Sequence, residues 1–338
     1  MTSRQRVLAS LRFEPTDRPP FDLMEGTVWP ELLEYFRSKR GCADAEAVQD
    51  FLGTDLRWVS VRYPDSMSQS NPEAERAHTD RFAGGVLRYA QSVAAVEAAE
   101  WLTPKDWEWE DFQAARQRWP EHALVLGHCW SPLFWGACIA FGMEEALVKM
   151  YTQPAVFEAF VARHHQFYME ALARGLRAAR GNCDVAWLGD DYASQENLLF
   201  APDLWRKLIK PYLAQQVALL HRNRLPVLFH SCGNVRELLP DFIEIGIDGL
   251  LVFQTTARNM DAASIAREFG GKIAFYGGID VQRLLSFGTP TEVRDCVREN
   301  LRLFAGCGGY IVANCHHRVA TIRGENIKAM CETAREWT

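Results

Sequence analysis

The stretch PVLFHSCGNVRELLPDFIEIGIDGLLVF, residues 226–253, decides the architecture expected of this chain. It begins with a short apolar run (226–232), continues through a segment with helical spacing (234–245) and ends in a second apolar run (249–253). Both runs are apolar at almost every position, which is typical of strands that are covered by helices on both faces. The stretch therefore predicts a strand, a helix and a second strand parallel to the first.

The same alternation of apolar runs and helical segments extends over most of the chain. The other expected strands are residues 19–24, 55–63, 124–129, 184–190, 272–278 and 309–314. The other expected helices are residues 142–149, 154–180, 202–224, 261–269, 290–304 and 323–336. Eight strands close a barrel, so we predict an α/β fold, a single (β/α)₈ TIM barrel over residues 1–338. Residues 65–122, which contain GGVLRYA and several tryptophans, are expected to form an insert with a hairpin.

Composition excludes several classes of function. The 338 residues carry a formal net charge of −6 with no block of like charges, so no nucleic-acid partner is expected. No apolar stretch is long enough for a transmembrane helix, and the start of the sequence has no apolar leader segment. The nine cysteines are odd in number and scattered, which favours free thiols in the cytoplasm.

The expected strands end in polar or metal-binding residues, and in a barrel the carboxyl ends of the strands form the active site. These residues are His128 and Cys129, Asp190 and Asp191, His230 and Cys232, Gln254, Tyr276 and Asp280, and Asn314 to His317. We predict catalytic roles for Asp190 and Tyr276. Neighbouring strand residues face opposite sides, so only one of the two aspartates should face the mouth, and we favour Asp190. His164 and His165 lie in a helical stretch and are expected to be packing or surface residues.

His230 and Cys232 are two residues apart, so both side chains are expected on one side of the chain. A catalytic zinc ion takes three nitrogen, sulfur or oxygen ligands and keeps one position open. The last strand offers Cys315, His316 or His317 as the third ligand. The alternative is a small buried thiol beside a hydrogen-bonded histidine, with no metal.

Five motifs in order resemble the uroporphyrinogen decarboxylase superfamily. They are LRFEPTDRPP (11–20), LWRKLIKPYL (204–213), HSCGNVRELLPDFIEIGIDGL (230–250), YGGIDVQRLLSFGTP (276–290) and ENIKAM (325–330). The superfamily also contains cobalamin-dependent methyltransferases that act on coenzyme M and other thiols. The resemblance implies a (β/α)₈ barrel and suggests a homodimer.

The methyltransferase branch is the more similar one. Its zinc motif begins with His-x-Cys, which His230 and Cys232 match, and its third ligand falls at Cys315 or at His316. The resemblance implies that zinc activates a small-molecule thiol, which takes a methyl group from a methylcobamide carried by a corrinoid protein. The apolar, aromatic insert would suit such a partner docked over the barrel mouth.

The decarboxylase branch differs in its charge near the first strand. Decarboxylases of this superfamily hold the carboxylates of their substrate with an arginine-rich loop, but here no basic residue lies between Arg18 and Arg37. Glu25 and Glu31 occupy that region and would repel a polyanion. Two alternatives remain open. One is a metal-free, decarboxylase-like lyase that uses Asp190 and Tyr276, and the other is a barrel that binds a corrinoid or tetrapyrrole without turnover.

Overall fold

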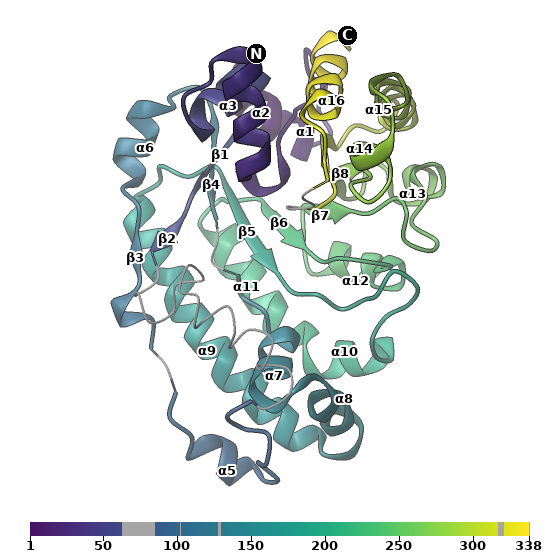
Figure 1. Ribbon diagram of the computed structural model, residues 1–338. Coiled ribbons are helices and arrows are strands. Elements are labelled where there is room, and N and C mark those ends of the chain that lie inside the picture. The colour runs from purple at the N-terminus through teal and green to yellow at the C-terminus, as the bar shows by residue number, and fades with distance from the viewer. Residues whose placement is uncertain (63–84, 102, 128–129, 317–320, 338) are drawn as a thin grey trace.

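The computed structural model describes residues 1–62, 85–101, 103–127, 130–316 and 321–337. Its centre is a curled sheet of parallel strands in the order β1-β4-β5-β6-β7-β8-β9 (Figure 1). The strands are β1 (Leu56–Val59), β4 (Ala123–Leu126), β5 (Val185–Gly189), β6 (Val227–His230), β7 (Gly249–Phe253), β8 (Ala274–Ile279) and β9 (Tyr310–Asn314). Each of these strands overlaps a segment that the apolar runs predicted.

The expected first strand, residues 19–24, is reduced to one bridge between Phe21 and Val312 of β9. The Val312 N–H donates to the carbonyl of Pro20 (2.9 Å), and the Asp55 N–H, next to β1, donates to the carbonyl of Phe21 (2.8 Å). The segment thus occupies the eighth position, between β9 and β1, which confirms the predicted TIM-barrel fold. Pro19 and Pro20 have no N–H to donate, which explains why the ladder is so short here.

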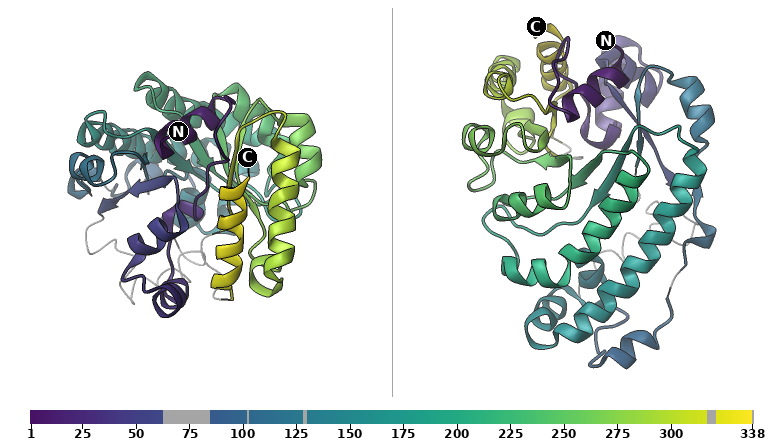
Figure 2. Two further views of the ribbon diagram at one scale, coloured as in Figure 1. Left: turned by 90° about the horizontal axis from the view of Figure 1, so that it is seen from above. Right: turned by 180° about the vertical axis from the view of Figure 1, so that it is seen from behind.

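Helices surround the strands. Their bounds are α1 (Ser3–Leu11), α2 (Pro30–Arg40), α3 (Ala45–Leu52), α5 (Val93–Glu97), α6 (Phe112–Arg118), α7 (Phe134–Phe141), α8 (Met143–Thr152), α9 (Pro154–Ala179), α10 (Pro202–Leu208), α11 (Lys210–Arg222), α12 (Leu239–Glu244), α13 (Ala262–Phe269), α14 (Leu284–Phe287), α15 (Pro290–Phe304) and α16 (Gly324–Glu336), with the short 3₁₀ helices η1 (Met24–Gly26), η3 (Pro104–Asp106) and η4 (Arg236–Leu238). The helices after residue 142, except residues 284–287, lie where helical spacing predicted them, and the helices before residue 142 were not expected. The capping box of Thr289 and Glu292 fixes the start of α15. α15 and α16 lie side by side (Figure 2).

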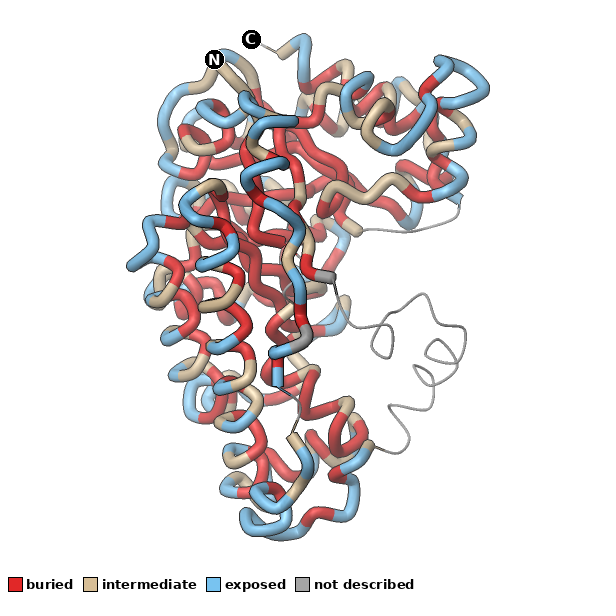
Figure 3. Tube along the Cα trace, turned by 90° about the vertical axis from the view of Figure 1, so that its left-hand side faces the viewer, coloured by how far each residue is buried: buried red, intermediate tan, exposed pale blue. Residues whose placement is uncertain are grey.

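The core has an inner and an outer layer. Inside the barrel pack Leu56, Val125, Val185, Trp187, Leu228, Leu251, Ala274, Tyr276 and Ile311, and Val7 and Leu11 of α1 join this cluster. Ala123, Val252 and Ala313 also belong to this inner cluster, and most other apolar residues of the strands pack against the surrounding helices. The strands are therefore buried on both faces, while the helices expose one face (Figure 3).

The insert is bordered by an antiparallel pair, β2 (Val61–Arg62) and β3 (Glu108–Trp109). This pair joins the insert to the strand residues before it and is not a hairpin within residues 65–122, so the expected hairpin stays a prediction; residues 86–89 of GGVLRYA form a turn. Trp107 packs edge-on against Phe167 of α9, with ring centroids 5.0 Å apart, so the insert is tied to this long helix. None of the helices in the described part of the chain has the length and apolar character needed to cross a bilayer.

Candidate metal centre

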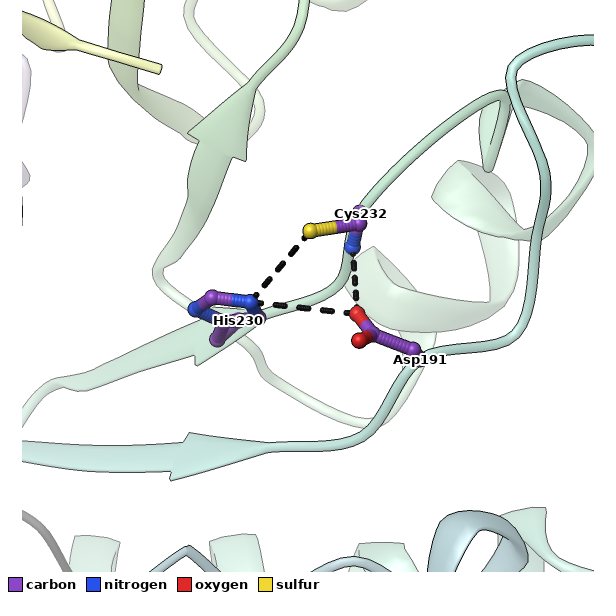
Figure 4. Close-up of side chains that lie close together, drawn as sticks. All are labelled: Asp191, His230 and Cys232. Atoms are coloured by element: carbon purple, nitrogen blue, oxygen red, sulfur yellow. Dashed lines mark hydrogen bonds and ion pairs between the residues drawn. The ribbon is translucent and has the colours of Figure 1, made fainter. Parts of the chain in front are cut away.

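Asp191, His230 and Cys232 converge at the carboxyl ends of β5 and β6. One ligand atom of each lies within 4.8 Å of the others, and their side chains point toward one another (Figure 4). The Nε2 atom of His230 lies 3.5 Å from Sγ of Cys232 and 3.8 Å from Oδ1 of Asp191. The backbone N–H of Cys232 donates to Oδ1 of Asp191 at 2.7 Å, which locks the two strand ends together. Nitrogen, sulfur and oxygen donors are therefore presented to one point.

The alternation of side chains along β5 and β6 explains this convergence. Val185 and Trp187 point into the barrel, so Asp191 continues the inward-facing series. Leu228 points inward on β6, and His230 continues the same series. The two strands are in register with Gly189 opposite His230, so the two inward series end side by side.

Glu25 holds the imidazole of His230 from the other side. Its Oε1 lies 2.7 Å from Nδ1 of His230, and both side chains are buried. Burial lowers the pKa of His230, but the Glu25 carboxylate and Cys232 outweigh it, so the pKa is raised well above 6.5. A carboxylate on Nδ1 fixes the orientation of the ring and leaves Nε2 to face the other two donors, as in many metal-binding histidines.

The loop that carries Glu25 is held in a strained conformation. Glu25 has a φ of +51°, in the left-handed region that residues other than glycine seldom adopt. Its N–H donates to the hydroxyl of Tyr276 (3.2 Å), and the N–H of Met24 donates to the side chain of Asn314 (3.0 Å). Such a conformation persists only when its surroundings over-determine it, and it is common at functional sites.

Tyr276 lies beneath the metal centre, in the interior of the barrel. Its hydroxyl donates to Oδ2 of Asp22 (2.9 Å), which also accepts from the indole of Trp58 (3.0 Å). Burial raises the pKa of Asp22 to about 7, although these two donors act in the opposite direction. The hydrogen bonds of Tyr276 link Asp22 to the loop that carries Glu25. The catalytic role expected for Tyr276 stays a prediction.

Asp190 occupies a different place from Asp191. Its Oδ2 accepts the N–H groups of Leu133 (2.9 Å) and Phe134 (2.7 Å), and its Oδ1 accepts the N–H of Trp135 (2.9 Å). It thus accepts from the N–H groups at the start of α7 that have no partner within the helix. Burial raises the pKa of Asp190 to about 7, against the effect of these donors. We favoured Asp190 as the aspartate facing the mouth, but the structure places Asp191 beside His230 and Cys232.

The residues expected from the last strand lie near this centre without joining the triad. Cys315 is buried, and its N–H donates to the carbonyl of Ile279 (3.0 Å). Burial raises the pKa of Cys315 to about 12, with smaller effects from Asp280 and Cys232. The carbonyl of His316 accepts from the side chain of Asn314 (2.7 Å). His128, Cys129 and His317 lie outside the described residues.

The polar side chains at two other strand ends accept hydrogen bonds from backbone N–H groups. Asp280 accepts the N–H groups of Gln282, Arg283 and Leu284 at the start of α14. Gln254 accepts the N–H of Gly233 at 2.6 Å and so braces the loop after Cys232. Glu25 was not among the residues expected at the site, although its position just after the first strand places it at the same end of the barrel as His230.

Comparisons with known proteins agree with this architecture. The family model for uroporphyrinogen decarboxylase (URO-D) matches residues 97–337. No curated protein matches the chain. Among solved structures, a methyltransferase from Methanosarcina mazei aligns with a TM-score of 0.66 over 99% of each chain at 18% sequence identity, which shows a shared fold. Because the family model covers well over half of the 338 residues, the chain belongs to the uroporphyrinogen decarboxylase family.

Proposed function

We propose that this protein is a zinc-dependent methyltransferase that moves a methyl group from a methylated corrinoid protein to a thiol. The observation that carries the proposal is the convergence of Asp191, His230 and Cys232 on one point at the barrel mouth. The methyltransferase fold of the Methanosarcina protein and the His-x-Cys motif support the same branch of the family.

The donor set fits zinc. Zinc in proteins binds histidine nitrogen, cysteine sulfur and carboxylate oxygen, and a catalytic site uses three protein ligands. His230 would bind through Nε2, because its Nδ1 faces the Glu25 carboxylate. Cys232 would bind through Sγ. The third ligand is either Asp191, whose Oδ1 already lies in the triad, or Cys315, which the family resemblance favours.

The residues around this centre prepare it for a sulfur nucleophile. When bound, zinc lowers the pKa of a thiol that occupies its open position. Glu25 holds the imidazole still, and Trp130 packs edge-on against it with ring centroids 4.9 Å apart. In the transfer the thiol would give its proton to solvent, its sulfur would form a bond to the methyl carbon, and the methyl–cobalt bond would break with its electron pair left on cobalt.

The charges at the mouth argue against a polycarboxylate substrate. Asp22 and Glu25 are both buried in the loop that follows the first strand position. The nearby Arg57 points away from the mouth, because its guanidinium donates to Thr54 and to Asp50. Two buried carboxylates would repel a substrate that carries several negative charges.

Metal analysis of the purified protein tests this proposal. We expect about one zinc per chain in the wild type and in Cys307→Ser, a control cysteine outside the triad, and most of the zinc lost in Cys232→Ser. Comparison of Asp191→Asn with Cys315→Ser identifies the third ligand, because only the variant that removes it loses zinc.

Activity is tested with methylcobalamin as donor and 2-mercaptoethanol as acceptor, by the absorbance change of the cobalamin. Transfer by the wild type that is lost in Cys232→Ser supports the proposal. Full zinc occupancy in Cys232→Ser, or no transfer by zinc-loaded wild type, contradicts it.

A further inference from the structure

A cavity lies beside the metal centre, between α7, α9 and the insert. Its volume is about 470 Å³. Its walls are aromatic and aliphatic, with Trp101 from the insert, Ile139 from α7, and Phe160 and Phe167 from α9. Ligand sites in proteins are typically cavities of about 300–1,000 Å³ with mostly apolar walls and a few polar groups. Size and lining both match a site for a small molecule.

Trp130 is shared by the cavity and the metal centre. It lines the cavity, and its ring packs edge-on against the imidazole of His230 at 4.9 Å. Gly189, the last residue of β5, makes room for it, because a Cβ there would lie 2.9 Å from the indole ring. A molecule in the cavity therefore has only one side chain between it and the metal ligand His230.

The chemistry of the walls selects the ligand. The acid among the lining residues is Glu100, and no lysine or arginine lines the cavity, so an anionic ligand would find no counter-charge in the described lining. Burial lowers the pKa of His164, another lining residue, to about 4, so its ring is neutral at pH 7. An apolar cavity of roughly 150 Å³ already holds benzene, so this one has room for a substituted aromatic ring.

His164 adds one polar atom to this surface. Its Nε2 is buried and has no hydrogen-bond partner among the described residues. Buried polar atoms usually have a hydrogen-bond partner. A hydroxyl or thiol group of a ligand in the cavity would supply the hydrogen bond that this nitrogen lacks. His164 was expected to be a packing or surface residue, and the contacts of its ring with Phe160 and Tyr168 agree with packing.

We propose that this cavity holds the aromatic part of the methyl acceptor, a neutral aromatic thiol whose sulfur extends past Trp130 to the metal centre. The inference rests on the proposed function, since it names the substrate class of the same site. Binding of an aromatic ring in the cavity needs neither zinc nor a corrinoid, so it can be tested separately.

Binding is tested with 4-fluorotoluene, which has no thiol, and metal-free protein, by ¹⁹F NMR. Ile139→Trp fills the cavity, and Val148→Trp makes the same kind of change at an exposed position of α8. We expect wild type and Val148→Trp to bind the probe and Ile139→Trp to bind it at least about tenfold more weakly. Equal melting temperatures and zinc contents show that Ile139→Trp is folded. Absence of binding to wild type, or equal binding to Ile139→Trp, overturns the inference.

Turnover separates the two proposals. In Ile139→Trp, kcat/KM should fall at least about tenfold more for benzyl mercaptan than for 2-mercaptoethanol, and in the control Val148→Trp it should change little for either thiol. Equal losses for both thiols, or no loss for benzyl mercaptan, overturn a substrate role for the cavity. If the probe binds as expected but zinc-loaded protein methylates neither thiol, the methyltransferase proposal and the substrate role fall together, while the binding result stands.

Discussion

Replacing Asp190 with alanine should destabilise the protein strongly, because this carboxylate anchors the start of α7. Its two oxygens accept the N–H groups of Leu133, Phe134 and Trp135, and its side chain is buried. Alanine would leave these three N–H groups without their acceptor. A buried, unsatisfied N–H group costs about 1–3 kcal/mol, so even the lower end gives a loss of about 3 kcal/mol.

Asp190→Asn provides an intermediate case. One amide oxygen can replace Oδ2 and keep the bonds to Leu133 and Phe134, but the amide NH₂ would face the N–H of Trp135. Asparagine also removes a buried charge that burial disfavours, since the pKa of Asp190 is raised to about 7, and this offsets part of the loss. We expect Asp190→Asn to be destabilised by about 1–2 kcal/mol, less than Asp190→Ala.

Urea unfolding at pH 8, followed by both circular dichroism and tryptophan fluorescence, measures these losses. The two signals must coincide, because a chain of this length can unfold in steps. Asp203→Ala is the matched control, since Asp203 lies in the first turn of α10 but is 92% exposed in its side chain. It should change stability by less than about 0.5 kcal/mol. If Asp190→Ala is as stable as this control yet inactive, Asp190 is not an anchor and the predicted catalytic role is correct.

Three further changes should each have a distinct effect. Glu25→Gln should weaken zinc binding about 10–100-fold, measured by competition with a chelator, because it removes the carboxylate that holds His230. Asp22→Asn should flatten the pH dependence of the free energy of unfolding, because the pKa of Asp22 is raised to about 7 in the folded protein. The stability that Asp22 contributes therefore falls by up to about 4 kcal/mol as the pH rises from about 4 to 7. Equal slopes in both proteins would contradict this. Arg18→Ala should lower stability by about 2 kcal/mol in urea unfolding without changing zinc content, because Arg18 binds buried Asp55 through two hydrogen bonds.

The sequence predicted the strands well because their burial on both faces leaves apolar runs bounded by polar residues. The same property hides which side of a strand faces the interior. In β5 every residue is buried, so nothing in VAWLG shows that Val185 and Trp187, rather than Ala186 and Leu188, point inward. The choice between Asp190 and Asp191 depends on that parity.

The end of the barrel at which Glu25 lies follows from its place after the first strand, but its contact with His230 could not be predicted. Glu25 is 205 residues away from His230 in the chain, and its contact depends on a left-handed turn that nothing in the letters MEG requires. The short first strand has a local cause that was visible, since two consecutive prolines limit any ladder. Helix α7 was missed because its residues are apolar on nearly all sides, which gives no amphipathic pattern.

The two aspartates at the end of β5 have separate places in the site. Asp191 completes the triad with His230 and Cys232, while Asp190 holds the start of α7. The residues held by Asp190 lie between Trp130 and Ile139, at the start of α7. The end of β5 therefore positions both the metal centre, through Asp191, and the wall of the aromatic cavity, through Asp190. A shift of Asp190 would move Trp130 relative to His230. The spacing between the proposed zinc and the proposed substrate ring is therefore set by β5, on the rigid barrel, and substrate preference can vary through residues of α7 and the insert while the ligands stay fixed.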